Sequence, residues 1–231
     1  MRLQKLSFVR LQMKVLLYAV FLMYFTVDAF SGESAILKKY RSSVVAHWSF
    51  NENRSVIVGD SSLNNNHGLI QGDAKNYSWT SDSIEGSALS LSGNAYVQVE
   101  NSSSLSLKSD FTISCWFLSR DVKSKSKIIS KRNLDNEFAL YLIGIENGKI
   151  FGGIGNGKEV SLTPKDAPVA PGVWHNVIMV YEYTARRIRL YLDGKKVSEK
   201  SSISGLFTGN AKLSIGADYE GMTDYFNGII D

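Results

Sequence analysis

Residues 172–181 read Gly172-Val173-Trp174-His175-Asn176-Val177-Ile178-Met179-Val180-Tyr181, and residues 188–195 read Ile188-Arg189-Leu190-Tyr191-Leu192-Asp193-Gly194-Lys195. Both runs are rich in β-branched and aromatic residues, and a short polar segment separates them. The second run ends at Asp193-Gly194, a pair that favours a tight hairpin turn. The sequence therefore predicts a long β-hairpin, and with it an all-β domain rather than a helical or α/β scaffold.

Short β-prone runs, separated by Gly, Asn, Asp and Ser, continue along the chain without a long helical period. This spacing is typical of a two-sheet antiparallel sandwich or jelly roll. The candidate strands are Val44–Phe50, Ala88–Leu91, Tyr96–Val99, Phe111–Leu118, Lys127–Lys131, Phe138–Ile145, Lys149–Gly153, Trp174–Tyr181, Arg187–Leu192, Leu213–Ile215 and Phe226–Ile230.

Three of these runs predict which side chains form the core. Alternation in the run Phe111–Leu118 puts one set of side chains on a single buried face. These residues are Phe111, Ile113, Cys115 and Phe117. Leucines of two later runs are expected to join the core, namely Leu140, Leu142, Leu190 and Leu192. Cys115, the only cysteine, is predicted to be a small buried hydrophobe, and the chain forms no internal disulfide.

Residues 1–29 have the pattern of a signal peptide. The basic residues of its start are Arg2, Lys5, Arg10 and Lys14. An apolar run, Val15–Phe25, and small residues at Val27-Asp28-Ala29 follow. The run is shorter than the ~20 residues that span a bilayer. We predict a cleaved signal, with an uncleaved anchor as the alternative. The protein is then secreted, extracellular or at the cell surface, and meets the membrane only through this segment.

Most of the net positive charge of the chain comes from this predicted signal peptide. The whole chain has 26 basic and 22 acidic residues, a net charge of +4. Without residues 1–29 it keeps 22 basic and 21 acidic residues, a net charge of +1. A nucleic-acid partner is therefore not expected, because such binding depends on a basic surface. Residues 30–43 are polar and mixed, and we predict a linker or leader there.

Several segments after residue 43, taken in order, resemble one family. They are Ala46–Glu52, Asp60–Gly68, Glu85–Gly93, Tyr96-Val97, Asp110–Trp116, Ile128–Lys131, Trp174-His175, Leu190–Gly194, Leu213–Gly216 and Phe226–Asp231. Over residues 44–231 the chain resembles the LamG-like jelly-roll domains (laminin G domain 3 type) of the concanavalin A-like lectin/glucanase superfamily. It departs from the family at Asn51, where Asp is usual, and at Leu63 and Asn65, where Gly is usual. The family's last strand normally continues beyond the position of Asp231, so we expect a truncated domain.

The resemblance implies a structural calcium ion. The loop Asp60–Gly68 is rich in carboxylate and amide oxygens, which calcium prefers as ligands. In the family the first and last strands lie side by side, so Asp231 is expected to meet this loop. The implied ligands are Asp60, Asn66 and Asp231. The alternative is an Asx-rich turn held together by its own side-chain to backbone hydrogen bonds.

The sequence does not predict an enzyme. The laminarinase branch of the superfamily uses a Glu-x-Asp-x-x-Glu strand, which does not occur here. The segment Asp218-Tyr219-Glu220 holds the nearest pair of carboxylates and is expected to be a solvated loop. The histidines have no metal-ligand spacing; they are His47, His67 and His175.

Two groups of side chains are candidates for ligand binding. Four aromatic residues in expected loops form a candidate sugar platform, namely Tyr77, Trp79, Tyr219 and Tyr225. The alternative is that they cover the edges of the core. A basic group could hold a sulfated or uronic polysaccharide if its members converge, or be a solvated face. Its members are Lys123, Lys125, Lys127, Lys131, Arg132, Arg186, Arg187 and Arg189.

Together these features predict an extracytoplasmic, non-catalytic binding module for a carbohydrate, either a polysaccharide or a glycoprotein glycan. Two alternatives stay open. One is a protein-binding adhesion or surface-structure module with a surface protein as its partner. The other is an accessory domain of a secreted glycoside hydrolase or polysaccharide lyase. The fold alone does not choose among them.

Overall fold

The computed structural model describes residues 41–132, 139–155, 159–203, 205–206 and 209–231. The chain divides into two units, residues 1–44 and residues 45–231. In the first unit the described structure includes a short 3-10 helix, η1 (Arg41–Ser43). The predicted signal peptide, residues 1–29, and the predicted linker up to residue 40 lie outside the described residues. Within the described residues, no helix is both long and apolar enough to cross a membrane.

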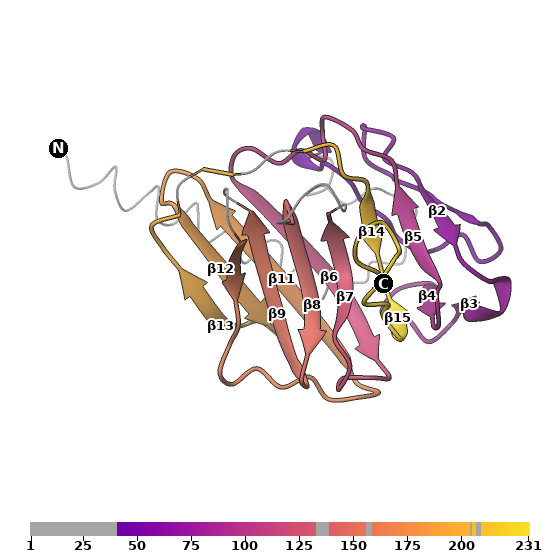
Figure 1. Cartoon of the computed structure of the whole chain (residues 1–231). Coiled ribbons are helices and arrows are strands. Elements are labelled where there is room, and N and C mark those ends of the chain that lie inside the picture. Colours follow the sequence, from indigo (N-terminus) through magenta and orange to yellow (C-terminus); the bar gives the residue numbers. More distant parts are fainter. Residues whose placement is uncertain (1–40, 133–138, 156–158, 204, 207–208) are drawn as a thin grey trace. The chain divides into compact units, whose positions relative to one another are not determined.

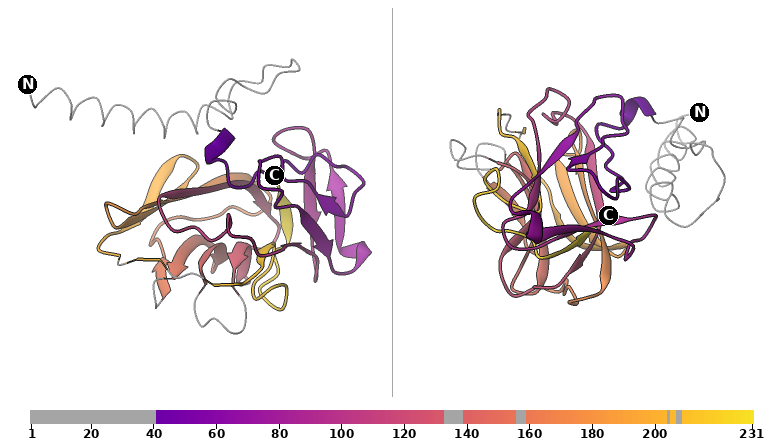
Figure 2. Two further views of the ribbon diagram at one scale, coloured as in Figure 1. Left: turned by 90° about the horizontal axis from the view of Figure 1, so that it is seen from above. Right: turned by 90° about the vertical axis from the view of Figure 1, so that its right-hand side faces the viewer.

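The second unit is a sandwich of two antiparallel sheets (Figure 1). In spatial order, the eight-stranded sheet contains β1 (Ile57–Val58), β2 (Gly68–Gln71), β5 (Tyr96–Val99), β14 (Leu213–Ile215), β7 (Ser126–Lys131), β8 (Tyr141–Glu146), β9 (Lys149–Gly155) and β10 (Glu159–Leu162). The seven-stranded sheet contains β13 (Lys195–Lys200), β12 (Arg187–Leu192), β11 (Trp174–Glu182), β6 (Phe111–Ser119), β15 (Gly228–Ile230), β4 (Ala88–Leu91) and β3 (Tyr77–Thr80). Another short 3-10 helix, η2 (Ala74–Asn76), precedes β3. Figure 2 shows the two layers from further sides. The predicted all-β jelly-roll sandwich is confirmed.

The hairpin that decides the fold class is present. Strands β11 and β12 pair from Val177↔Leu192 to Glu182↔Arg187. Asp193 and Gly194 have φ angles of 49° and 75°, so both central turn residues are left-handed, as a tight turn between β12 and β13 requires. Strand β13 was not expected from its sequence, because all of its residues except Val197 are polar or charged.

The core lies between the sheets. Phe117 is fully buried, and Phe111, Ile113 and Cys115 pack against the same core, as predicted. Burial raises the pKa of the Cys115 thiol to about 12, so it is an inert apolar group. Leu142 differs from the prediction, because it joins a small cluster with Ala139 and Phe151 apart from the main core.

A bulge in β7 decides which side chains point outward. Strict alternation would put Lys127, Ile129 and Lys131 on one face. The register shifts between Lys127 and Ile129 instead. Ile129 and Lys131 therefore pair with residues whose side chains face the core, whereas Lys127 pairs with Gly144 and faces outward. Lys131 is consequently buried inside the sandwich.

The predicted strand Val44–Phe50 is not formed in the structure. This segment has only an isolated bridge between Trp48 and Asp60. The Asp60 carboxylate accepts a hydrogen bond from the His47 N–H, which removes that donor from any strand ladder. The last strand, β15, pairs with β4 and β6.

Candidate functional site

A polar row crosses the outer face of the eight-stranded sheet. The cross-strand pairs Gln98↔Ser214, Ser214↔Ser130 and Ser130↔Leu142 join β5, β14, β7 and β8. Chain neighbours of this row, such as Ile215 and Ile143, belong to the core. Since side chains alternate along a strand, the row itself faces away from the core. This face is the floor of the candidate site.

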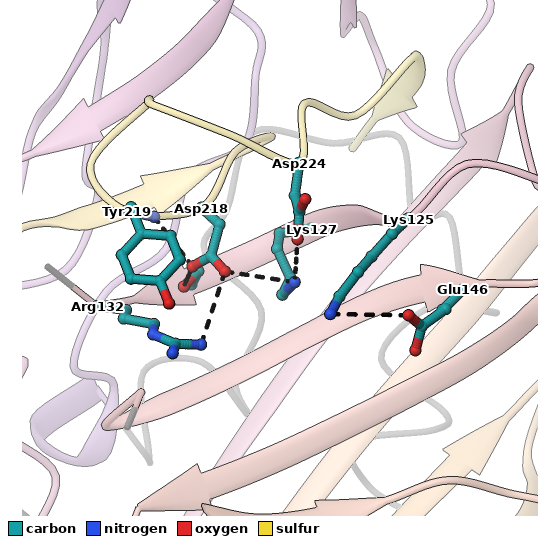
Figure 3. Close-up of polar contacts among 8 residues, drawn as sticks. Lys125, Lys127, Arg132, Glu146, Asp218, Tyr219 and Asp224 are labelled. Carbon is teal, nitrogen blue, oxygen red and sulfur yellow. Dashed lines mark hydrogen bonds and ion pairs between the residues drawn. The ribbon is translucent and has the colours of Figure 1, made fainter. Parts of the chain in front are cut away.

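The loop of residues 216–227, between β14 and β15, is tied to this floor. Ser130 Oγ donates a hydrogen bond to Asp218 Oδ1. Lys127 Nζ lies 3.3 Å from Asp218 Oδ2 and 2.7 Å from Asp224 Oδ2, so one ammonium group joins both ends of the loop. Figure 3 shows Lys127 between the two carboxylates. We call this loop with its floor the loop–sheet site.

The charges of the site are buried and therefore need their partners. Lys127 is 2 % exposed and Asp218 is 1 % exposed. A buried ion is tolerated when an opposite charge and hydrogen bonds replace its water. Asp218 also lies 4.0 Å from Arg132. The expectation that Asp218-Tyr219-Glu220 is a solvated loop is thus wrong for Asp218, because its carboxylate is an interior anchor.

Aromatic rings stand beside these charges. The Cζ atom of Arg132 lies 4.2 Å from the centre of the Tyr219 ring, a cation–π distance. The rings of Tyr96 and Tyr225 lie 6.4 Å apart, and the Tyr96 hydroxyl donates a 3.0 Å hydrogen bond to the Glu220 carbonyl. Tyr219 and Tyr225 are both half-buried, so part of each residue stays open to solvent.

The loop takes a shape that few sequences allow. Tyr219, Glu220 and Asp224 all have left-handed φ angles, between 46° and 55°. Gly221 has a φ of 85°, and a Cβ atom there would come within about 2.0 Å of the Tyr96 ring. Only glycine fits this position, because it combines a left-handed backbone with direct contact to an aromatic ring.

Tyr77 and Trp79 lie elsewhere, on the edge strand β3 rather than in a loop. They pair with Leu91 and Leu89 and pack against the core. Trp79 Nε1 donates a 3.1 Å hydrogen bond to the Ser55 carbonyl. Within the described part of the chain, no contact joins this pair to the loop aromatics. The four-residue platform stays a prediction, and two of its members have the core-covering position that was the alternative.

The implied calcium ligands fall into two places. Asp60 Oδ2 accepts a 2.8 Å hydrogen bond from the Asn66 N–H, so these two residues are neighbours. Asp231 Oδ2 instead accepts hydrogen bonds from the Ile84 and Glu85 N–H groups. Among the described residues, no three His, Cys, Asp or Glu side chains gather as a metal centre.

The Asp60 carboxylate is already saturated. Each of its oxygens accepts two hydrogen bonds, from His47 N and Ser62 N on one and from Ser62 Oγ and Asn66 N on the other. Burial acts to raise the pKa of Asp60, but these hydrogen bonds outweigh it and hold the pKa below its ordinary value. The residues as placed do not fit a preformed calcium site, and the calcium ion stays a prediction.

The basic residues of the sequence do not converge on one face. Lys131 points into the sandwich, where its ammonium group bonds to Asn101 Oδ1 and the Ala211 carbonyl. Lys125 lies 3.7 Å from Glu146, as Figure 3 shows. On β12 the arginines are paired with acidic side chains of their own sheet; the pairs are Arg187–Glu182, Arg189–Glu182 and Arg189–Glu199.

His175 has a structural position. Its Nδ1 lies 2.7 Å from Asp193 Oδ2, and its Nε2 accepts a hydrogen bond from the Ala170 N–H. These contacts use both ring nitrogens and tie β11 to the Asp193 turn.

The model of the Laminin_G_3 family, described as the concanavalin A-like lectin/glucanases superfamily, matches residues 91–231. No curated protein matches the sequence.

Among solved structures, domain 4 of an extracellular GH43 arabinanase from Geobacillus stearothermophilus, in complex with arabinotriose, is similar with a TM-score of 0.63 and 18% identity. The match covers 81% of this chain and 88% of that one. The botulinum neurotoxin serotype G binding domain matches with a TM-score of 0.57 and 14% identity, over 81% of this chain and 46% of that one. This chain thus spans about half of that toxin domain.

The CBM40 domain of the Ruminococcus gnavus IT-sialidase, bound to α2,3-sialyllactose, matches with a TM-score of 0.51 and 12% identity. That match covers 62% of this chain and 85% of the domain. At these identities the likenesses establish the shared fold.

Proposed function

We propose, from the premise that this chain belongs to the Laminin_G_3 family of the concanavalin A-like lectin/glucanases superfamily, that it is a non-catalytic carbohydrate-binding module of an extracytoplasmic protein. The similar solved structures include binding domains named with arabinotriose and sialyllactose. We place the glycan-binding surface at the loop–sheet site.

One observation carries this placement. The half-buried Tyr219 is held beside the Arg132 guanidinium on the outer face of the eight-stranded sheet. Ligand sites combine aromatic surface with a few fixed polar groups. A sugar ring offers an apolar C–H face to an aromatic ring and hydroxyl groups to its neighbours. Arg132 fixes the Tyr219 ring before the ligand arrives, which reduces the entropy lost on binding.

The polar group that a sugar hydroxyl can reach is the Asp224 carboxylate, whose side chain is 26 % exposed. Ser214 Oγ is buried in the outer row and has no hydrogen-bond partner in the described structure. A buried hydroxyl without a partner costs roughly 1–3 kcal/mol. Ser214 is only 1 % exposed, so a small water molecule, and not a sugar ring, would recover part of that free energy.

A glycan array with the purified protein tests the proposal. The array should contain arabinan fragments, other neutral oligosaccharides, sialyllactose and gangliosides. We expect binding to at least one glycan class, and weaker binding by the Tyr219→Ala variant. If the protein gives the circular dichroism spectrum of a folded β-sandwich but binds no glycan, the proposal is wrong.

A protein-binding adhesion module is the second candidate, and one surface feature favours it. Val56, Ile57 and Leu69 lie on or beside β1 and β2 at the edge of the eight-stranded sheet and are 45–53 % exposed. An aliphatic group at a sheet edge is a common protein contact. Replacing Ile57 and Leu69 by Ser would weaken attachment to a surface protein and leave glycan binding unchanged.

The third reading, an accessory domain of a secreted glycoside hydrolase or polysaccharide lyase, agrees with the likeness to one domain of an arabinanase. This reading concerns the larger protein to which the domain would belong, and it is compatible with glycan binding by the domain. Sequencing the coding region on both sides would decide it.

A further inference from the structure

The loop–sheet site contains basic side chains, but each of them is paired with a carboxylate of the site itself. Lys127 lies within 3.3 Å of both Asp218 and Asp224. Arg132 lies 4.0 Å from Asp218. At the margin of the site, Lys212 Nζ lies 2.8 Å from Glu100.

A fourth carboxylate belongs to the loop. Glu220 Oε1 accepts a 2.9 Å hydrogen bond from the Lys212 N–H. Lys127, Arg132 and Lys212 therefore face four acidic groups, those of Glu100, Asp218, Glu220 and Asp224. Lys131, inside the sandwich, also interacts with the charge of Glu220. The four cations and four carboxylates then sum to zero, which gives no long-range attraction to an anion.

An anionic ligand would also have to compete at short range. The Lys127 ammonium is buried, and its third side meets the Phe151 ring, whose centre lies 5.2 Å away. A sugar carboxylate or sulfate could reach Lys127 only by displacing Asp224 or Asp218. Displacing Asp218 would leave a buried charge without its partner, which is strongly unfavourable.

The same arrangement accepts hydroxyl groups. The Asp224 side chain is 26 % exposed, Lys127 binds its Oδ2, and its Oδ1 makes no hydrogen bond or ion pair with the described residues. An ionised carboxylate is an acceptor only. The free oxygen therefore receives an O–H donor from a neutral sugar and repels a negatively charged one.

From these observations we propose that the loop–sheet site recognises an uncharged, hydroxyl-bearing glycan and discriminates against sugars that carry carboxylate or sulfate groups. Its polar contact is a sugar hydroxyl that donates to the partly exposed Asp224 carboxylate, on the same loop as the Tyr219 ring. This inference rests on the proposed function and names the ligand class of the same site.

The test compares neutral arabinan oligosaccharides with oligogalacturonate, heparin fragments and sialyllactose by calorimetric titration of the purified protein. Each ligand is measured at about 20 and about 300 mM NaCl, which changes the screening length several-fold. We expect the neutral glycan to bind at least about tenfold more tightly than any acidic one, and its affinity to change by less than about twofold with salt.

The Asp224→Asn variant tests the proposal by a gain of affinity for acidic glycans. The amide keeps the size of the side chain and removes the charge that competes for Lys127. Acidic glycans should then bind at least about threefold more tightly than to the unaltered protein, and only at low salt. Asp166→Asn is the matched control, because Asp166 is an exposed aspartate on the segment that leads to β11.

The outcomes separate two failures. If the unaltered protein prefers an acidic glycan and salt weakens that binding, the inference is overturned while the proposed function stands. If no glycan of either class binds, the proposed function fails as well. If Asp224→Asn folds and gains nothing, the carboxylates do not set the selectivity. Should Asp224→Asn not fold, the selectivity and salt dependence of the unaltered protein still decide the question.

Discussion

The guanidinium carbon of Arg132 lies 4.2 Å from the centre of the Tyr219 ring. Arg132 directly follows strand β7, and Tyr219 belongs to the loop after β14, so the pair joins a sheet to a loop that is distant in sequence. An aromatic side chain on a loop is normally free to turn. Here the ring has a fixed neighbour, and the loop beneath it is anchored by Lys127.

Lys127→Met should destabilise the domain far more than Lys125→Met. The first change removes a buried ammonium and leaves the Asp218 carboxylate with weaker partners, which typically costs about 3–5 kcal/mol. Lys125 is about half exposed and lies 3.7 Å from Glu146, so its loss should cost less than about 1 kcal/mol. Urea unfolding of both variants measures the difference. Equal free energies of unfolding would show that the buried cluster does not anchor the loop.

Gly221→Ala should cost more than Gly148→Ala. Both glycines have left-handed φ angles, 85° and 73°. A Cβ atom at Gly221 meets the Tyr96 ring, whereas one at Gly148 meets nothing within 4 Å. Gly148→Ala thus carries only the backbone strain, about 1–2 kcal/mol. Thermal unfolding should show a lower melting temperature for Gly221→Ala, and glycan affinity should fall only in that variant. Identical behaviour would mean that the loop yields easily.

Asp60→Ala should lower the melting temperature by several degrees whether calcium or chelator is present. The change removes an acceptor of four hydrogen bonds, each worth about 1 kcal/mol net. Calcium should not raise the melting temperature of the unaltered protein, because those bonds occupy the carboxylate. A calcium-dependent rise that Asp60→Ala abolishes would instead establish the metal site that the family resemblance implies.

Low pH should destabilise the domain through the same residue, Asp60. The pKa of Asp60 is lower in the folded protein than its ordinary value of 3.8, so its ionisation favours folding. This contribution is complete above pH 3.8 and is lost as the pH falls further, through the folded-state pKa. Asp60→Asn should therefore lose less free energy of unfolding than the unaltered protein when the pH falls from 5 to 3. Parallel losses in the two proteins would contradict this role.

Lys131 should make the stability of the domain depend on pH in the alkaline range. Burial lowers its pKa to about 8, while the charge of Glu220 opposes the change. Between pH 8 and the ordinary value of 10.5 the unfolded chain binds more protons than the folded one, so stability rises with pH. Lys131→Met should flatten this rise in urea unfolding at pH 7.5 and 9.5. If the free energy of unfolding rises equally with pH in Lys131→Met, other groups cause the rise.

The fold was largely predictable, because the strands that determine it are apolar. The β11–β12 hairpin and the inward face of β6 follow from the pattern of their side chains. Strands β3 and β13 did not, since each is an edge strand with polar positions and depends on backbone pairing with one neighbour. The run Val44–Phe50 has the pattern of a strand, but Asp60 binds the His47 N–H that a ladder would need.

The site was predictable only in part. The sequence correctly placed Tyr219 and Tyr225 in the loop before the last strand, whereas their part in ligand binding stays a prediction. The pairing of Lys127 with Asp218 could not, because it depends on the β7 bulge that turns Lys127 outward and Lys131 inward. Tyr96, which contacts this loop, lies in a run that reads simply as a strand. A buried aspartate such as Asp218 also gives no signal in the sequence that separates it from a solvated one.

The most direct measurement is the affinity of Tyr219→Ala for the glycan that the unaltered protein binds best, with Tyr183→Ala as the control. Tyr183 is 51 % exposed in the turn between β11 and β12, so its removal matches the chemical change at a different place. We expect at least about a tenfold loss of affinity for Tyr219→Ala, equal to about 1.4 kcal/mol, and no change for Tyr183→Ala. Unchanged binding by a folded Tyr219→Ala protein would contradict the assignment of the glycan site to this loop.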